Sequence, residues 1–170
     1  MRLVDEVRGA GGAAAQEVAT RVGVDSAADA QATVGLCRSI ATRAHAGQVD
    51  KAGEPYIGHP AHVAASVEGE FEECVAWLHD VVEDTGITLD DLRALGVPDE
   101  VVSAVDALTR RVGEGYFDYV RRAGANALAR PVKLADLRHN SDLSRLASVG
   151  PDDIARAEKY REAIGILQGL

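Results

Sequence analysis

The segment from His79 to Thr85 reads His-Asp-Val-Val-Glu-Asp-Thr and holds four ionisable side chains. We expect one helix over residues 71–84. Side chains four apart share a helix face, so His79 should lie beside Glu83, and Asp80 beside Asp84. A neutral imidazole next to a carboxylate is typical of a metal-ligand pair, and the two later carboxylates can handle protons. The apolar positions expected to face the core are Phe71, Cys74, Val75, Leu78, Val81 and Val82.

A lone histidine on an apolar face is more often a packed core residue, and acidic side chains near a helix end are usually solvated. Two further clusters favour a site. His59 ends the glycine- and proline-rich loop 48–59, and Asp136 and Asn140 share one face of an expected helix. Two imidazoles with two carboxylates suit Mn, Fe or Zn better than Ca or Mg. The four candidate metal ligands are His59, His79, Asp80 and Asp136.

Four segments, in this order, resemble the hydrolase domain of the RelA/SpoT alarmone enzymes and their stand-alone small hydrolases, within the HD phosphohydrolase superfamily. Residues 44–48 read Ala-His-Ala-Gly-Gln, and residues 51–60 read Lys-Ala-Gly-Glu-Pro-Tyr-Ile-Gly-His-Pro. Residues 78–85 read Leu-His-Asp-Val-Val-Glu-Asp-Thr, and residues 132–136 read Val-Lys-Leu-Ala-Asp. The resemblance extends over residues 30–147.

This resemblance implies a compact all-α HD-domain bundle of several helices. It implies one Mn²⁺ ion, with another divalent transition metal as the alternative, held by the four candidate ligands. It also implies that Glu83 and Asp84 act on the attacking water or the leaving group, and that Lys51 and Asn140 contact the substrate. The reaction of the family removes pyrophosphate from the 3′ position of ppGpp or pppGpp.

Two features depart from the family pattern. Asp50 occupies the position before the motif lysine, where these hydrolases usually carry an arginine against the guanine base, and an acid cannot replace a stacking cation. Residues 136–140 read Asp-Leu-Arg-His-Asn, whereas the family pattern has the middle pair exchanged. Residues 116–122 and 129–136 look more like small stand-alone HD phosphohydrolases of bacteria. Asp50 is therefore a candidate substrate contact for a different base or sugar.

Two alternatives stay open beside alarmone hydrolysis. The first is an HD phosphohydrolase that acts on another nucleotide or small phosphate ester, which Asp50 favours. The second is a catalytically idle domain that binds a nucleotide for regulation. The complete set of ligands and carboxylates argues against the idle domain, because buried charge without a use is costly.

Composition agrees with an enzyme of the cytoplasm that binds a small nucleotide. The chain has 170 residues, 27 acidic against 18 basic, and no basic run, which disfavours nucleic-acid binding. No apolar run approaches the ~20 residues of a membrane span, and we expect no signal peptide because residues 1–6 lack an apolar stretch. Cys37 and Cys74 are expected to be buried small side chains. We expect an N-terminal extension, helical or mobile, at 1–26 and one HD domain at 27–170, and the oligomeric state stays open.

Capping and proline signals divide the chain into helices, and no segment shows the alternation typical of strands. Thr88 and Asp91 resemble a capping box, and Pro60, Pro98 and Pro151 can each open a helix. The expected helices span residues 27–47, 60–67, 71–84, 88–96, 98–111, 116–123, 126–147 and 151–167.

The other histidines receive structural interpretations. We expect His45, with Gln48, to brace the motif loop, and His62 to lie at the surface. A residue turns about 100° around a helix axis relative to its neighbour. His139 should therefore point away from the face of Asp136 and Asn140.

Overall fold

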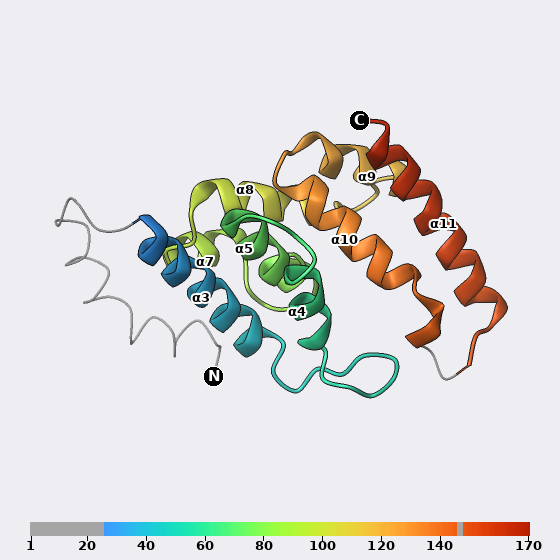
Figure 1. Ribbon diagram of the computed structural model, residues 1–170, viewed down its shortest axis with the longest axis horizontal. Helices are drawn as coiled ribbons and strands as arrows, with labels where there is room; N and C mark the ends of the chain where they lie inside the picture. The colour runs from blue at the N-terminus through green and yellow to red at the C-terminus, as the bar shows by residue number, and fades with distance from the viewer. Residues whose placement is uncertain (1–25, 146–147) are drawn as a thin grey trace.

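The computed structural model describes residues 26–145 and 148–170 of the protein, and in this part of the chain it is all-α, as predicted (Figure 1). The extension expected at 1–26 lies outside the described residues except for Ser26, so that domain boundary stays a prediction. The helices are α3 (Ser26–Ala44), α4 (Gly58–Ala64), α5 (Glu70–Leu78), α6 (Val81–Asp84), α7 (Leu89–Ala94), α8 (Asp99–Leu108), α9 (Tyr116–Ala125), α10 (Ala129–Ser141), the short 3₁₀ helix η1 (Leu143–Arg145) and α11 (Pro151–Gln168).

Helix α5 lies at the centre of the bundle. It packs against α3, α4, α8 and α10, and its residues from Cys74 to Leu78 are all buried. A helix that is apolar on every side is stable only when neighbours cover it on every side. The core around it consists mainly of alanine, valine and leucine, in a chain with only 4% aromatic residues.

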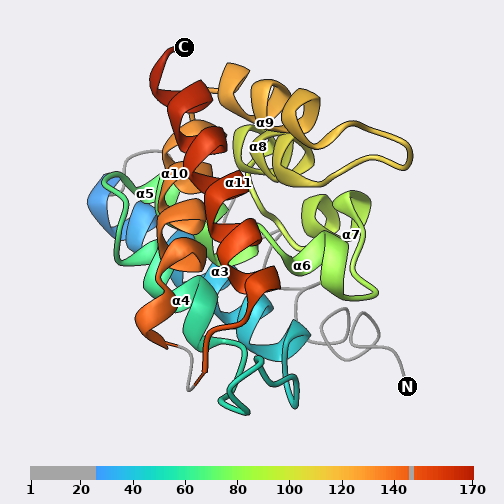
Figure 2. The ribbon, with the colours of Figure 1, turned by 90° about the vertical axis from the view of Figure 1, so that its right-hand side faces the viewer.

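Helices α10 and α11 lie side by side on the far side of α5 from α3 (Figures 1 and 2). Pro151 is the first residue of α11, as predicted, and the Asp153 carboxylate accepts a hydrogen bond from the Gly150 N–H at 3.0 Å. The predicted capping box of Thr88 and Asp91 is also present, at the start of α7. These local signals fix where the helices begin.

The single helix predicted over 71–84 is wrong. Helix α5 ends at Leu78, and α6 begins at Val81. The Nδ1 of His79 lies 2.7 Å from the carbonyl oxygen of Ala76, which the N–H of Asp80 would use in a continuous helix. The imidazole therefore competes with the helical hydrogen bond at this point. Asp80 still lies beside Asp84, as predicted, since the Asp84 N–H donates to the Asp80 carbonyl at 2.9 Å and the Tyr56 hydroxyl lies within 3.4 Å of both carboxylates.

Other boundaries also differ from the prediction. Helix α3 ends at Ala44, α8 ends at Leu108, and α10 begins at Ala129 and ends at Ser141. Asn126 stays outside α10 because its Oδ1 accepts the backbone N–H groups of Leu128 and Ala129, each at 3.0 Å. Pro60 is the third residue of α4 rather than the first.

The apolar stripe predicted over 71–82 is only partly confirmed. Cys74, Val75, Leu78 and Val81 are fully buried, as is Cys37. Phe71 is 37% exposed and Val82 is half-buried, because both lie at the ends of the region that neighbouring helices cover.

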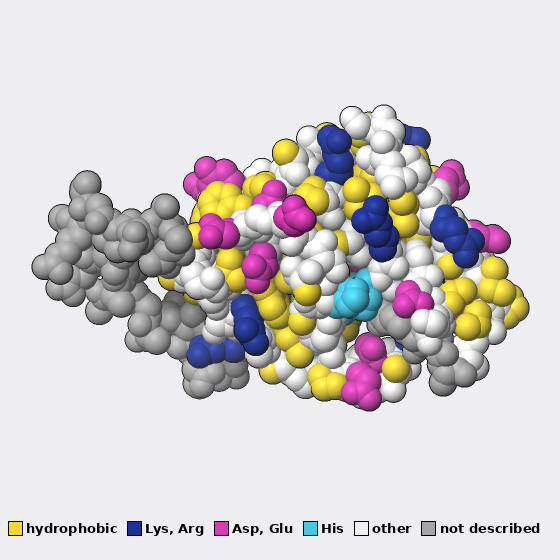
Figure 3. All heavy atoms as spheres, viewed as in Figure 1, with side chains coloured by type: hydrophobic (Ala, Val, Ile, Leu, Met, Phe, Trp, Pro, Cys, Tyr) yellow, Lys and Arg dark blue, Asp and Glu magenta, His cyan; other side chains and the backbone are white. Residues whose placement is uncertain are grey.

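Charged side chains do not gather into a basic surface on the face shown in Figure 3, where lysines and arginines stand apart among acidic and apolar groups. Among residues 26–145 and 148–170, no helix combines the length and apolar character that crossing a lipid bilayer requires.

Arg122 on α9 joins that helix to the end of α8. Its guanidinium donates to three backbone carbonyls at the end of α8, at 3.0–3.2 Å, and to the carboxylate of Glu114 at 2.7 Å. The last carbonyls of a helix have no partner within the helix, so a charged donor there caps it. Glu114 holds the guanidinium in place.

We predict that Arg122→Met lowers the free energy of unfolding by about 2 kcal/mol, the scale of hydrogen bonds that involve a charged group. Urea unfolding measures the change. The neighbouring Arg121 is the control, because it pairs with Asp118 at 3.1 Å and both side chains are exposed. Arg121→Met should change stability by less than about 0.5 kcal/mol. Equal effects of the two changes would contradict the capping role.

Candidate metal centre and its cavity

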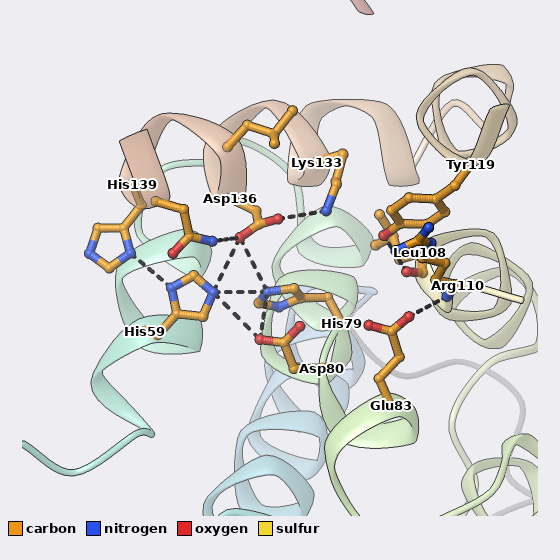
Figure 4. Close-up of polar contacts among 12 residues, drawn as sticks. His59, His79, Asp80, Glu83, Leu108, Arg110, Tyr119, Lys133, Asp136 and His139 are labelled. Carbon is orange, nitrogen blue, oxygen red and sulfur yellow. Dashed lines mark hydrogen bonds and ion pairs between the residues drawn. The ribbon is translucent and has the colours of Figure 1, made fainter. Parts of the chain in front are cut away.

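The four predicted metal ligands come together from three places in the fold (Figure 4). His59 lies on α4, Asp136 lies on α10, and His79 and Asp80 occupy the break between α5 and α6. The Nε2 atoms of His59 and His79 are 3.2 Å apart, and Asp136 Oδ1 lies 3.3 Å from the first and 4.0 Å from the second. Asp80 Oδ2 lies 3.1 Å from His79 Nε2 and 3.5 Å from His59 Nε2.

This donor set fits a divalent transition metal. Imidazole nitrogens and carboxylate oxygens bind such ions at about 2.0–2.2 Å, which places neighbouring ligands about 3–3.5 Å apart. Among the described residues, one group of His, Cys, Asp and Glu side chains offers ligand atoms within 4.8 Å of one another, and it consists of His59, His79 and Asp136. The Nε2 atoms of His59 and His79, 3.2 Å apart, can share one proton in a hydrogen bond, and both can face a single cation once that proton is lost.

His79, Asp80 and Asp136 each contact a further polar group of the protein. His79 lies against the carbonyl of Ala76, and Asp136 accepts hydrogen bonds from Asn140 at 2.5 Å and Lys133 at 2.8 Å. The hydroxyl of Tyr56 donates to Asp80 Oδ2 at 2.5 Å. Partners of this kind orient metal ligands and raise the affinity for the ion.

The charges of the centre balance one another without a cation. Burial alone would lower the pKa of His79, but Asp80 and Asp136 raise it to about 9. Burial opposes the ionisation of Asp80, yet His79 outweighs it and lowers the pKa of Asp80 to about 2. For Asp136, burial is outweighed first by Lys133 and then by the imidazoles, so its pKa lies well below its usual range.

The predicted catalytic carboxylates Glu83 and Asp84 lie on α6, beside the centre but outside the cluster of ligand atoms. Glu83 Oε1 accepts the backbone N–H of Arg110, and Asp84 lies 3.4 Å from the hydroxyl of Tyr56. Partial burial raises the pKa of Glu83, and the Arg110 N–H acts against that shift. Burial, followed by the charge of Asp80, raises the pKa of Asp84.

A cavity of about 470 Å³ opens onto the centre. His59, Asp80 and Asp136 contribute to its floor, and the predicted substrate contacts Lys51, Asn140 and Asp50 lie among its other walls. The predicted site residues His59, Asp80, Asp136, Lys51, Asn140 and Asp50 therefore all line one cavity. His79, Glu83 and Asp84 are not among its lining residues.

Helix α11 completes the cavity with two residues that the sequence analysis did not single out, Arg156 and Tyr160. They are four positions apart, so they share one face of the helix. That spacing is the only signal for them in the sequence, and it gives no hint of which surface α11 covers. Arg156 pairs with Asp153 at 2.5 Å.

Asp50 has a structural role in the motif loop. Its Oδ1 accepts the backbone N–H groups of Ala52 at 2.8 Å and Glu54 at 3.0 Å, which closes the turn before Pro55. Short acidic side chains commonly bond to the backbone two residues on in this way. The loop geometry thus gives a reason for an acid at this position that is independent of the substrate.

Two histidine predictions are confirmed and one is wrong. The ring of His45 lies 2.8 Å from Gln48 Oε1, and Gln48 in turn donates to the carbonyl of Asp84, so the pair braces the motif loop. His62 is exposed. His139 does not point away, since its Nδ1 lies 2.8 Å from Nδ1 of His59. The prediction did not allow for the packing of α4 against α10, which brings His59 beside His139.

Comparisons with known proteins agree with this geometry. No protein-family model matches the chain. A probable guanosine-3′,5′-bis(diphosphate) 3′-pyrophosphohydrolase of Synechocystis sp. is 35% identical over 144 residues, which cover 73% of this chain and 19% of that protein. The bifunctional (p)ppGpp synthase/hydrolase SpoT of Escherichia coli is 35% identical over 145 residues, which cover 77% of this chain and 20% of SpoT. The chain thus spans about a fifth of the length of these curated relatives.

Among solved structures, that of a metazoan ortholog of SpoT that hydrolyzes ppGpp matches with a TM-score of 0.66. The match covers 88% of this chain and 89% of the other, at 23% sequence identity. At this identity the likeness shows the fold, which is the all-α bundle described above.

We predict that the metal-free protein loses stability as the pH rises from about 6.5 to about 9. The pKa of His79 is about 9 in the folded protein and 6.5 for an ordinary imidazole. Below pH 6.5 the folded and the unfolded protein both hold the proton on His79, and the stabilisation by this proton is fully present. Between pH 6.5 and 9 only the folded protein holds the proton, so the stabilisation falls as the pH rises, and it is lost above pH 9. Urea unfolding in a chelating buffer measures the trend.

The control is the same series with saturating Mn²⁺. A cation requires a bare nitrogen, so the stabilisation by the metal should grow with pH over this window. Stability in the chelating buffer that is constant or rising with pH would contradict the prediction.

Proposed function

We propose that this chain, an HD domain of the RelA/SpoT type, hydrolyses the 3′-pyrophosphate of a guanosine alarmone such as ppGpp or pppGpp. The observation that carries the proposal is the convergence of two imidazoles and two carboxylates from α4, α10 and the break between α5 and α6, beside a cavity of about 470 Å³. The names of the two curated relatives support the choice of substrate.

The proposed cofactor is one Mn²⁺ ion, held by His59, His79, Asp80 and Asp136. A bound divalent cation of this kind polarises a water molecule and screens phosphate charge. The nitrogen and oxygen donors favour Mn²⁺, Fe²⁺ or Zn²⁺ over Ca²⁺ and Mg²⁺. The choice of Mn²⁺ among the first three comes from the family resemblance.

Glu83 and Asp84 are the proposed proton carriers. An effective general acid or base has a pKa near the working pH, and the pKa values of both carboxyls are raised toward it. Both follow Asp80 on α6, whereas the carboxylate of Asp80 itself lies 3.1 Å from His79 Nε2. Glu83 is further oriented by the backbone N–H of Arg110.

The cavity walls are suited to a phosphorylated ligand even though the chain carries a formal net charge of −9. Lys51, Lys133 and Arg156 bring three cationic side chains to one cavity. Asn140 and Tyr160 add neutral polar groups that can bond to a ribose or a base. We therefore place Lys51 and Arg156 against phosphates, and Asn140 against the sugar.

A second candidate is the hydrolysis of a different nucleotide, and the observation that favours it is Asp50 in the cavity wall. A carboxylate there disfavours a nearby polyphosphate and can accept a hydrogen bond from another base or sugar. This second candidate would use the same proposed metal ligands and the same proposed proton carriers. An idle regulatory domain is disfavoured, because the raised pKa values of Glu83 and Asp84 suit proton transfer.

The experiment that tests the proposal incubates the Mn²⁺-loaded protein with ppGpp, ppApp, NADPH and nucleoside monophosphates, and follows pyrophosphate and phosphate separately. Release of pyrophosphate from ppGpp with kcat/KM above ~10⁴ M⁻¹s⁻¹ is expected. Release of phosphate from another compound at such a rate would establish the second candidate, and the absence of any hydrolysis would leave the idle domain.

We predict that Glu83→Gln retains the metal and loses activity by roughly two orders of magnitude or more, the usual scale for a general acid or base. Asp80→Asn should instead lose the metal, because a charged ligand is removed. Metal analysis of both variants after gel filtration separates the two roles. Loss of the ion from Glu83→Gln would make Glu83 a ligand, and full occupancy in Asp80→Asn would remove Asp80 from the proposed centre.

We also predict that Asp50→Asn lowers KM for ppGpp. The asparagine keeps the oxygen that accepts the N–H groups of Ala52 and Glu54, so the turn should survive while the negative charge is lost. Asp50→Ala is the control that breaks the turn. A rise in KM for ppGpp in Asp50→Asn, with unchanged stability, would show that the carboxylate itself contacts the substrate.

A further inference from the structure

His139 lies outside the four proposed ligands but contacts one of them. Its Nδ1 lies 2.8 Å from Nδ1 of His59, and the two rings are nearly parallel, at 17°, with centroids 5.0 Å apart. Figure 4 shows His139 on the side of His59 away from His79 and Asp80. His139 therefore holds the outer edge of the His59 ring, and the ligand nitrogen of His59 is the inner one.

The geometry decides which ring donates when a cation is bound. A hydrogen bond between two Nδ1 atoms needs one protonated and one bare nitrogen. His59 Nε2 faces His79 Nε2 at 3.2 Å and Asp136 Oδ1 at 3.3 Å, so it must be bare to act as a ligand. The proton of a neutral His59 is then on Nδ1, and His139 accepts it with a bare Nδ1 and carries its own proton on Nε2.

We propose that His139 is a positioning residue that fixes His59 in the tautomer able to bind the cation, and so strengthens the binding of that cation. The proposal rests on the metal site argued above. It gives His139 no contact with the ion or the substrate.

The two histidine ligands are held in different ways. His79 lies against the backbone carbonyl of Ala76 at 2.7 Å, an oxygen that can only accept. The Nδ1 atom of His139, by contrast, can either accept a hydrogen bond from His59 or donate one to it. In the reverse arrangement His139 donates to His59, and the proton of His59 moves to Nε2, where it points at Asp136 and Asp80 and blocks the ligand nitrogen. Binding of the cation therefore selects one of two arrangements of the His59–His139 pair.

A second ring supports His139 from outside. His62, one turn after His59 on α4, stacks on His139 with centroids 3.9 Å apart at 19°. The stack is a packing contact, whereas the bond to His59 is a polar one. The two contributions can be separated by substitution.

The test compares His139→Leu with His139→Asn. All three side chains branch at Cγ. Asparagine can place an oxygen acceptor where Nδ1 stands, and leucine places a methyl group there. Titration with Mn²⁺, followed by the electron paramagnetic resonance signal of the free ion, gives the dissociation constant. We expect His139→Leu to weaken binding 10- to 100-fold, the usual cost of losing such a partner, and His139→Asn to restore most of it.

Wild-type affinity in His139→Leu, or an equal loss in both variants, would overturn the proposal. The control is His62→Leu, which removes the stacked ring and leaves the bond to His59. A loss in that variant as large as in His139→Leu would assign the effect to stacking, and would also overturn the proposal.

A second test uses nuclear magnetic resonance of the wild-type protein, so it does not depend on whether the variants fold. In the wild-type protein loaded with diamagnetic Zn²⁺, ¹⁵N–¹H correlation spectra should show His59 protonated at Nδ1 and His139 protonated at Nε2. The opposite tautomers would contradict the assignment.

The failure of the metal site and the failure of this proposal are distinguishable. Full Mn²⁺ affinity in His59→Ala would remove the proposed site. Binding that depends on His59 but is unaffected by the side chain at 139 would remove only the role of His139.

Discussion

The structure depends on gathering two imidazoles and two carboxylates at the edge of the core, where the Nε2 atom of each histidine lies within 4.0 Å of both carboxylates. Burying such groups is costly unless each has a partner. The fold supplies Lys133 and Asn140 to Asp136, and Tyr56 to Asp80. A cation bound between the four groups would replace the proton that the raised pKa of His79 keeps at the centre.

The helix break at His79 and Asp80 lies at this centre. Both residues keep right-handed helical backbone angles there, φ −59° and ψ −32° for His79 and φ −99° and ψ −8° for Asp80. The His79 ring lies 2.7 Å from the Ala76 carbonyl oxygen, and its Nε2 lies 3.1 Å from Asp80 Oδ2. Two adjacent residues between α5 and α6 thus face one site.

The cavity brings three cationic side chains together beside four aspartates, on a protein that is acidic overall. Lys51 comes from the motif loop, Lys133 from α10 and Arg156 from α11, three segments distant in the sequence. Net charge therefore says little about the ligand of this chain, since local placement decides it. Helix α11 has a double role, because it buries α10 and closes the cavity with Arg156 and Tyr160.

The sequence by itself determined the all-α class, the helix starts marked by Thr88 and Pro151, and the grouping of His59, His79, Asp80 and Asp136, because capping signals are local and the motif residues are recognisable by type and order. Only the tertiary structure decided what depends on contacts between distant segments. These are the break after Leu78, the approach of His139 to His59 and the Arg156 wall of the cavity. A helical period gives the face on which a residue lies but not the neighbour it meets, since the crossing of two helices is set by the side chains of the whole core.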